Sequence, residues 1–400
     1  MIWSHFRNLL TERLSPVLMN NKDFSRQSTG LNMVEKRPFT IWSAIHADPP
    51  LLVGIILLCA FGLFILYSAS GGDMEVVQRQ AIIMLGGVLA MFIVSQFNPH
   101  VIRTWVPSIY AVGLGLLLLV LLIGVEANGA RSWLDLPGLP SFQPSEVLKI
   151  SVPLSMAWYL GSRPLPPRFK HLFWSAFIII LPAALIIIQN DTGTAIMVAM
   201  SGIFVILLAG IRWRIVFFGI FGLLLASPAW FLFLAQEHQK NRILTFFDPY
   251  RDPTGAGYNI IQSQIAIGSG GLYGKGFGNG AQSHLDFIPE SNTDFILAVL
   301  AEEFGLIGIL FLICLYLFVL IRGFYIAYSA KDMFSRLLAG SITLTLFFYI
   351  FINMAMVSGL VPVIGLPLPL ISRGGTAILT LFISFGLLMS IQTHGKEFGK

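Results

Sequence analysis

The run FIPESNTDFILAVLAEEFGLIGILFLICLYLFVLI at residues 287–321 sets the character of the whole chain. It begins with a polar stretch that contains Glu290 and Asp294, and then stays mostly apolar for longer than the roughly 20 residues that a membrane-spanning helix needs. Carboxylates at the start of a membrane helix are costly and are usually retained for chemistry or transport. The run therefore predicts a membrane protein with a polar site at the mouth of a helix.

The composition of the chain also predicts a membrane protein. Hydrophobic residues make up 56% of the sequence, charged residues 11%, and the mean hydropathy is +0.78, whereas soluble domains carry roughly 25% charge. Cys59 and Cys314 lie in apolar runs, where small core side chains are expected and a disulfide is not. The net charge of +5 is spread along the chain, so it indicates cationic cytoplasmic loops and not nucleic-acid binding.

Ten apolar runs are long enough, some only just, to cross a membrane. The fourth is the weakest, because Glu146 and Lys149 lie at its start. The sequence thus predicts an all-α integral membrane protein, a polytopic bundle of ten transmembrane helices with a large extracytoplasmic loop, residues 236–292, between helices 7 and 8. The predicted spans are 50–68, 81–97, 106–125, 146–161, 171–188, 193–210, 214–234, 294–321, 336–358 and 375–392.

Loop charge predicts the orientation, because the cytoplasmic loops of membrane proteins carry an excess of Lys and Arg. With the N-terminus inside, most of these residues fall on the cytoplasmic side. Both termini are then cytoplasmic, and the 236–292 loop faces outward. We expect residues 1–40 to form a disordered cytoplasmic extension, with Met33 as an alternative start of translation, and residues 41–396 to form the membrane domain.

Asp294 is the first candidate for chemistry. In a partly dehydrated pocket its pKa would rise toward neutrality, and it would serve as a general base. The alternative is structural: Thr293 caps the helix that follows, and the helix dipole favours a carboxylate in the first turn. Glu290, one turn earlier, either shares the site or is a solvated loop charge.

Further candidates lie near the ends of other spans. Glu146 and Lys149 are spaced i, i+3 and so share one helix face; they form an internal ion pair, or the lysine meets a phosphate while the glutamate orients it. Asp191 follows Asn190 in a tight turn, where it is a site residue or a plain cap. Trp133 is a site residue or an interfacial aromatic residue.

Outward-facing cations are candidates for binding an anion such as a pyrophosphate. They run against the positive-inside trend, although each alone could be a solvated charge. For Glu302 and Glu303, deeper in the eighth span, the default expectation is a partner within the bundle. No His, Cys and Asp cluster has metal-ligand spacing, so no structural zinc is expected. The outward cations are Arg242, Arg251, Lys275 and Arg373.

Many short motifs, in order along residues 41–396, are those of one known family. On these motifs the chain resembles the SEDS family (shape, elongation, division and sporulation). HADP at 46–49 and QSHLDF at 282–287 resemble its elongation branch more than its division branch. The shared motifs are FQPSE at 142–146, DP at 248–249, GAGY at 255–258, QS at 262–263, IGSGG at 267–271, GKG at 274–276, FIPE at 287–290, TDF at 293–295 and GLPLP at 365–369.

The resemblance implies a peptidoglycan glycosyltransferase of the bacterial cytoplasmic (inner) membrane, with its active site facing the periplasm. Such enzymes polymerise lipid II into glycan strands during elongation and rod-shape maintenance, beside a class B penicillin-binding protein that cross-links the strands. The resemblance also implies contacts with other elongation-complex proteins and membrane lipids, and none with nucleic acid. The family's essential aspartate falls on Asp294. Its fourth-span glutamate and lysine fall on Glu146 and Lys149, and its loop tryptophan falls on Trp133.

Two short stretches depart from the family pattern. NDTGT at 190–194 stands where PDLGT is usual, and because the aspartate is kept, the turn should be kept too. SRGG at 372–375 stands where SYGG is usual. Arg373 therefore adds a positive charge near the expected site.

For the reaction, the resemblance implies that Asp294 takes the proton of the acceptor sugar 4-hydroxyl while that oxygen attacks the anomeric carbon of the donor. Undecaprenyl pyrophosphate then leaves with inversion, its charge offset by outward cations or by a divalent cation, Mg²⁺ or Mn²⁺. The alternatives are a lipid II flippase, a non-catalytic scaffold for the penicillin-binding protein, and the division paralogue of the same polymerase. A flippase needs access from both sides, so the crowding of polar residues on the outer face favours the enzyme.

Overall fold

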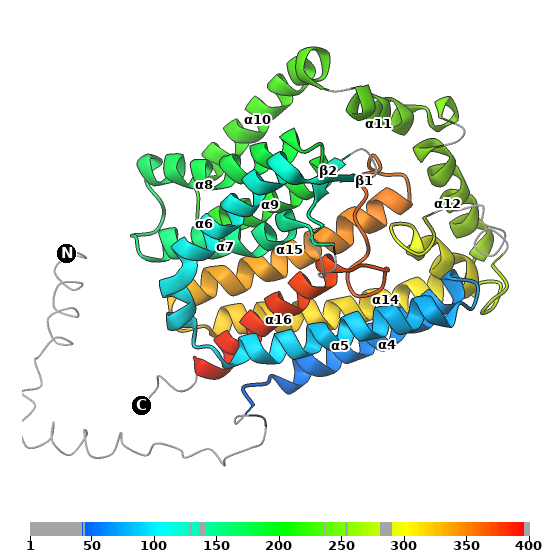
Figure 1. Ribbon diagram of the computed structural model, residues 1–400, viewed down its shortest axis with the longest axis horizontal. Helices are drawn as coiled ribbons and strands as arrows, with labels where there is room; N and C mark the ends of the chain where they lie inside the picture. Colours follow the sequence, from blue (N-terminus) through cyan, green and yellow to red (C-terminus); the bar gives the residue numbers. More distant parts are fainter. Residues whose placement is uncertain are drawn as a thin grey trace, which may run out of the picture. The chain divides into compact units, whose positions relative to one another are not determined.

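Long helices make up most of the chain in the computed structural model (Figure 1). The structure describes residues 42, 45–127, 130–135, 141–235, 237–252, 255–280 and 290–395, all within the unit Ile41–Phe398. The predicted extension at 1–40, which includes Met33, and the motif at 282–287 lie outside the described residues. The elements are α4 (Pro49–Ala69), α5 (Met74–Gln96), α6 (Pro99–Ile123), β1 (Val125–Ala127), β2 (Ala130–Trp133), α7 (Pro144–Gly161), α8 (Phe169–Ile188), α9 (Thr192–Leu208), α10 (Trp213–Ala229), the π-helix η1 (Trp230–Leu234), α11 (Glu237–Phe247), the 3₁₀-helix η2 (Pro249–Arg251), α12 (Ala256–Gly270), α14 (Ile296–Ser329), α15 (Met333–Val357) and α16 (Thr376–His394).

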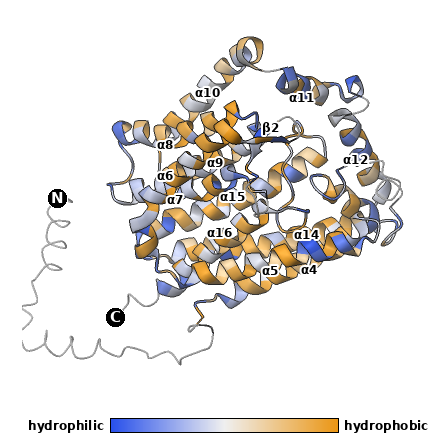
Figure 2. Cartoon of the chain, viewed as in Figure 1, coloured by the Kyte–Doolittle hydropathy of each residue, from blue (hydrophilic) through white to orange (hydrophobic). Residues whose placement is uncertain are grey.

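Eight helical segments in the described part are long and apolar enough to cross a membrane, namely α4, α5, α6, α8, α10 with most of η1, α14, α15 and α16. Figure 2 shows the hydrophobic residues that dominate these helices. Helices α7 and α9 coincide with the fourth and sixth predicted spans but are not among the eight. The polytopic helical membrane fold is confirmed, and the count of ten spans stays a prediction.

Side-chain caps fix where several helices begin. Asp48 accepts a hydrogen bond from the Leu51 N–H ahead of α4, and Asp332 accepts one from the Ser335 N–H ahead of α15. Such caps satisfy N–H groups that the first turn of a helix leaves unpaired. The Asp48 carboxylate also pairs with Arg322 of α14 at 2.6 Å, so the cap joins the first described long helix to the longest one.

Two segments differ from the expectation of helices joined by loops. The strands β1 and β2 pair in antiparallel fashion, and the Arg131 N–H donates to the Gln189 carbonyl at 3.0 Å, beside the turn between α8 and α9. The described part of 236–292 is not an open loop, because it contains α11, η2 and α12. Helix α12 packs against α14 and contributes buried side chains such as Ile260 and Ala266.

Helix α14 is broken at Gly305, whose φ of 61° is not helical. The glycine-rich turn that follows α12 inserts at the break. The Lys275 N–H donates to the Glu302 carbonyl and the Leu306 N–H donates to the Gly271 carbonyl, both at 3.0 Å. These bonds satisfy backbone groups that the break would otherwise leave unpaired, which is a requirement at membrane depth. The eighth predicted span is thus a broken helix, longer than predicted.

Helices α7, α15 and α16 form the buried centre of the bundle. Helix α16 packs along α5, and α15 packs against α14, α9 and α7. Helix α10 is different: none of its residues with a described exposure is buried, and its main packing partner is η1. In Figure 1 it extends away from the other helices toward α11. The centre around α7, α15 and α16 is therefore the rigid part on which a site can be built.

Candidate active site

The turn of residues 290–295 leads into α14 and carries Asp294. Helix α14 begins at Ile296 and has no side-chain cap, so the predicted cap by Thr293 is wrong. The Thr293 hydroxyl instead donates to Glu290 Oε2 at 2.5 Å. Asp294 therefore lies just outside the membrane-spanning helix.

The surroundings of Asp294 favour its protonated form more than water does. Burial, helped by the charge of Glu290 and opposed by Arg242, raises the pKa of Asp294 from 3.8 to about 6. A carboxylate with such a pKa is ionised at neutral pH and is still a useful proton acceptor. The turn thus presents a carboxylate suited to general-base chemistry.

A cavity of about 1110 Å³ opens beside this turn. This volume is slightly above the roughly 300–1000 Å³ typical of small-molecule sites. Lys275 and Arg251 are not in its wall. The other eight of the ten candidate residues line it, from segments that are far apart in the sequence: Trp133, Glu146, Lys149, Asp191, Arg242, Glu290, Asp294 and Arg373. The cavity is therefore the place where the predicted residues meet.

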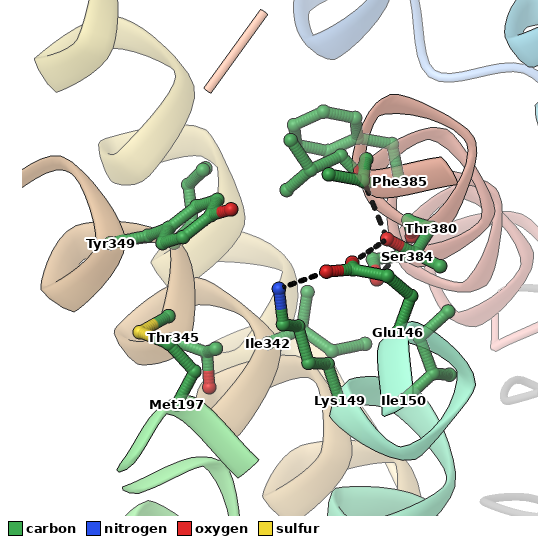
Figure 3. A pocket seen from close by; sticks show the side chains of 13 residues that line it. Glu146, Lys149, Ile150, Met197, Ile342, Thr345, Tyr349, Thr380, Ser384 and Phe385 are labelled. Carbon is green, nitrogen blue, oxygen red and sulfur yellow. Dashed lines mark hydrogen bonds and ion pairs between the residues drawn. The ribbon is translucent and has the colours of Figure 1, made fainter. Parts of the chain in front are cut away.

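Glu146 and Lys149 of α7 form the buried end of this cavity. Lys149 Nζ lies 2.5 Å from Glu146 Oε1, and the Thr380 hydroxyl donates to Glu146 Oε2 at 3.1 Å. The lysine also lies over the ring of Tyr349, 5.1 Å from its centroid. Figure 3 shows the pair between α7, α15 and α16, where it also lines a smaller pocket of about 40 Å³. The geometry is that of an internal ion pair with one side toward the large cavity.

Asp191 has both of the features considered for it. It caps α9, because Oδ1 accepts from the Thr194 N–H at 3.0 Å. Its Oδ2 accepts from Gln143 Nε2 at 2.7 Å, which ties the α8–α9 turn to the start of α7. Both Asp191 and Trp133 of β2 line the cavity.

Lys275 lies apart from the other predicted site residues. It is not in the cavity wall, and its Nζ lies 2.6 Å from Glu302 Oε1 at the break in α14. The expected partner of Glu302 within the bundle is thus a cation from the turn that follows α12. The structure gives Lys275 a structural ion pair, and its role toward a substrate remains only a prediction.

Backbone contacts on both sides fix Arg373, the residue that departs from the family pattern. Gln80 of α5 donates to the Ser372 carbonyl at 3.0 Å and accepts from the Gly374 N–H at 3.3 Å. The Arg373 N–H donates to the Asn292 carbonyl at 2.9 Å. The loop before α16 is therefore attached to α5 and to the turn that carries Asp294.

Sequence reasoning missed the residues that hold this turn. Ser372 donates to the Thr293 carbonyl at 2.5 Å, and Asn353 of α15 donates to the Asp294 carbonyl at 2.9 Å. An amide in an apolar span is costly unless it has a partner. The position of Asn353 in an apolar span could therefore have indicated that its side chain has a hydrogen-bond partner. Nothing in the sequence around Ser372 indicates its contact with the Thr293 carbonyl.

The comparisons with known proteins match the whole described bundle. The family model of cell cycle proteins that takes in FtsW, RodA and SpoVE matches residues 50–397. The peptidoglycan glycosyltransferase MrdB of Escherichia coli K12 is 44% identical over 363 residues, which are 90% of this chain and 97% of MrdB. The FtsW protein of Geobacter sp. strain M18 is 35% identical over 86% of this chain and 96% of its own length.

Solved structures agree with these matches. A chain in a peptidoglycan synthase complex that coordinates polymerization and crosslinking superposes with a TM-score of 0.77, at 29% identity over 88% of this chain and 99% of that chain. The rod shape determining protein RodA of Thermus thermophilus superposes with a TM-score of 0.66, at 28% identity over 88% of this chain and 98% of that one. The resemblance drawn from the motifs is confirmed, and the chain belongs to the FtsW/RodA/SpoVE family of cell cycle proteins.

Proposed function

We propose that this chain is a peptidoglycan glycosyltransferase that polymerises lipid II into glycan strands during cell elongation and rod-shape maintenance. One observation carries the proposal: a single cavity gathers the Asp294 carboxylate, a buried Glu146–Lys149 pair and two arginines. The identity with MrdB over 90% of the chain supports the same chemistry. The similarity to RodA of T. thermophilus supports the elongation role.

Asp294 is the general base in this proposal. Its carboxylate takes the proton of the acceptor sugar 4-hydroxyl as that oxygen bonds to the anomeric carbon of the donor. The bond from that carbon to the pyrophosphate oxygen breaks, and undecaprenyl pyrophosphate leaves with inversion. A pKa of about 6 at Asp294 supports this role, because general bases work best with pKa values near the operating pH.

Cations in the cavity wall stabilise the leaving group in this scheme. Arg242 of α11, Arg373 and Lys149 approach the cavity from three different segments. Guanidinium groups bind phosphate oxygens in a bidentate manner. Charge that grows on the pyrophosphate in the transition state is then offset by groups already in place.

A divalent cation, Mg²⁺ or Mn²⁺, fits the same site as part of the proposal. Among the described residues no group of three or more His, Cys, Asp and Glu has a metal-binding arrangement. Mg²⁺ is commonly held by one or two carboxylates together with substrate phosphates. Glu290, which lines the cavity, would hold it together with the substrate pyrophosphate, so that the Asp294 carboxylate stays available as the base. When bound, it would supply additional charge stabilisation for the pyrophosphate.

The proposed setting is the bacterial inner membrane. We propose that both termini are cytoplasmic, that the cavity faces the periplasm, and that a class B penicillin-binding protein is the partner that cross-links the product. The apolar helices support a multi-pass membrane protein. The similarity to a chain of a synthase complex that couples polymerization with crosslinking supports the partner.

The test uses the purified full chain together with its cognate penicillin-binding protein. The complex is incubated with lipid II, a divalent cation and penicillin, which blocks crosslinking. We expect glycan strands from the wild type and none above background from Asp294→Asn. The control Arg251→Ala changes an exposed cation outside the cavity wall and should leave the rate unchanged.

No glycan from a folded complex that binds lipid II would contradict the polymerase. In that case, movement of labelled lipid II across vesicles containing the chain would become the decisive assay, and a flippase would replace the polymerase as the function.

A further inference from the structure

Asn353 lies on α15 with no exposed surface. Its side-chain Nδ2 donates two hydrogen bonds, one to the Asp294 carbonyl at 2.9 Å and one to the Leu366 carbonyl at 2.6 Å. An Asn amide nitrogen has two hydrogens, so both are used. One side chain on a buried helix thus joins two irregular segments.

The two carbonyls belong to the two walls that enclose the Asp294 carboxylate. Asp294 is in the turn before α14. Leu366 follows Gly365, and Gly365 lies close to the carboxylate, because a Cβ on it would be 3.5 Å from Asp294 Oδ2. Neither segment is a regular helix or strand. Asn353 therefore helps to set the distance between the carboxylate and the loop that carries Gly365, because no helix ladder fixes it.

We propose that Asn353 is a positioning residue, which holds the Asp294 carboxylate at the depth and angle needed to take the acceptor proton. This rests on the proposed role of Asp294 as general base. Asn353 does not reach the reacting atoms in this account. It acts through the main chain of Asp294 and through the loop that carries Gly365.

A second tie makes the proposal testable without unfolding the site. Ser372 accepts from the Leu368 N–H at 2.8 Å and donates to the Thr293 carbonyl at 2.5 Å, and the Arg373 N–H donates to the Asn292 carbonyl. These bonds join the same loop and turn without Asn353. Removing the Asn353 donors should therefore loosen the turn near Asp294 while the segments stay together.

Asn353→Leu removes both donors and keeps a side chain that branches at Cγ. We expect the maximal rate of lipid II polymerisation in the purified complex to fall roughly 10- to 100-fold, because a misplacement of about 1 Å can cost that much. The KM for lipid II should stay within about twofold, since the cavity cations are untouched.

The pH profile separates positioning from plain destabilisation. Burial is the main cause of the raised Asp294 pKa, with Glu290 and Arg242 as the facing charges. A looser turn admits water, so the acidic limb of the Asn353→Leu profile should move to lower pH. Thr343→Val is the matched control and should leave the profile unchanged. It removes a buried hydroxyl on the same helix, which donates to the Ala339 carbonyl within that helix at 2.8 Å.

The results can distinguish a failure of the proposed role of Asn353 from a failure of the proposed role of Asp294. Wild-type rate and pH profile for Asn353→Leu, with Asp294→Asn inactive, would overturn the positioning role and leave the base in place. A slow Asn353→Leu with an unmoved pH limb and a KM that rises in parallel would also overturn it. An active Asp294→Asn would refute the base and the positioning role together.

Discussion

Gly365 lies directly beside the carboxylate of Asp294 in the candidate active site. Gly365 has a φ of 77°, and a Cβ on it would lie 3.5 Å from Asp294 Oδ2. This is a backbone conformation that glycine adopts freely and other L-residues adopt at a cost of about 1–2 kcal/mol. A side chain at position 365 would therefore occupy space next to the Asp294 carboxylate that glycine leaves open.

Gly365→Ala should therefore reduce both the rate of polymerisation and the stability of the fold. We expect a rate about tenfold lower and a loss of about 1–2 kcal/mol in the free energy of unfolding. The measurements are the initial rate of glycan formation and the thermal unfolding of the same sample. Gly86→Ala is the control, because a Cβ at Gly86 of α5 meets nothing within 4 Å; a similar loss of rate in that variant would contradict the account.

The activity should fall on the acid side of pH 6. With the pKa of Asp294 at about 6, only about a tenth of the base is ionised at pH 5, so the rate should be roughly tenfold lower there than at pH 8. The rate of glycan formation at lipid II concentrations well below the KM, measured from pH 5 to pH 8, checks this, because that rate reports the pKa of the free enzyme. A flat profile over that range would argue against Asp294 as the titrating base.

Protein stability should depend on the same group with a definite sign. The folded pKa of Asp294 is raised above 3.8, so folding favours the protonated form. Its contribution is fully present below pH 3.8 and is lost as pH rises through about 6. At pH 8, the free energy of unfolding of Asp294→Asn should therefore exceed that of the wild type by at most about 3 kcal/mol, and its unfolding temperature should be higher. At pH 4 the variant should show no gain. A variant less stable than wild type at pH 8 would contradict the burial of this carboxyl.

The Glu146–Lys149 pair should behave as a unit. Either Glu146→Gln or Lys149→Met leaves one buried charge without its partner, which typically costs about 3–5 kcal/mol. The double variant should recover most of the stability, because no charge is left alone, but should stay inactive if Lys149 also meets the substrate phosphate. Thermal unfolding and glycan formation by all three variants are the measurements. A fully active double variant would reduce the pair to a structural role.

Arg373 should affect substrate binding more than the chemical step. Its backbone is fixed by Asn292 and by Gln80 of α5, and its side chain lines the cavity. Arg373→Tyr restores the usual family residue and removes one cation. We expect the KM for lipid II to rise about 5- to 10-fold with a smaller change in maximal rate, and Arg251→Ala to change neither. An unchanged KM would mean that the guanidinium does not meet the substrate.

Much of the fold could be predicted from the sequence because apolar runs of membrane length have few alternatives. The Glu146–Lys149 pair followed from helical spacing, and its ion pair is present. The break in α14 could not be predicted, because nothing in the sequence distinguishes Gly305 from other small residues within an apolar helix. Its φ depends on a turn that is distant in sequence and bonds to the exposed backbone.

The sequence was enough to predict most residues of the candidate site, but not the contacts that bring them together. Charges near span ends marked Asp294 and Asp191, but sequence separation hides that they line one cavity. Lys275 was predicted to face outward like Arg242 and yet pairs with Glu302, because the broken helix brings that glutamate to it. Asn353 was missed because its two partners are backbone carbonyls, which leave no trace in residue type.

The proposed role of Asp294 as the base of a lipid II polymerase can be tested by comparing wild type and Asp294→Asn in purified complexes with the partner. The assay is run at pH 7.5, with lipid II saturating and crosslinking blocked. We expect at least a 100-fold loss of glycan formation, with retained lipid II binding and unfolding at or above the wild-type temperature. A rate within about twofold of wild type would contradict it, because an amide in that position cannot take the proton.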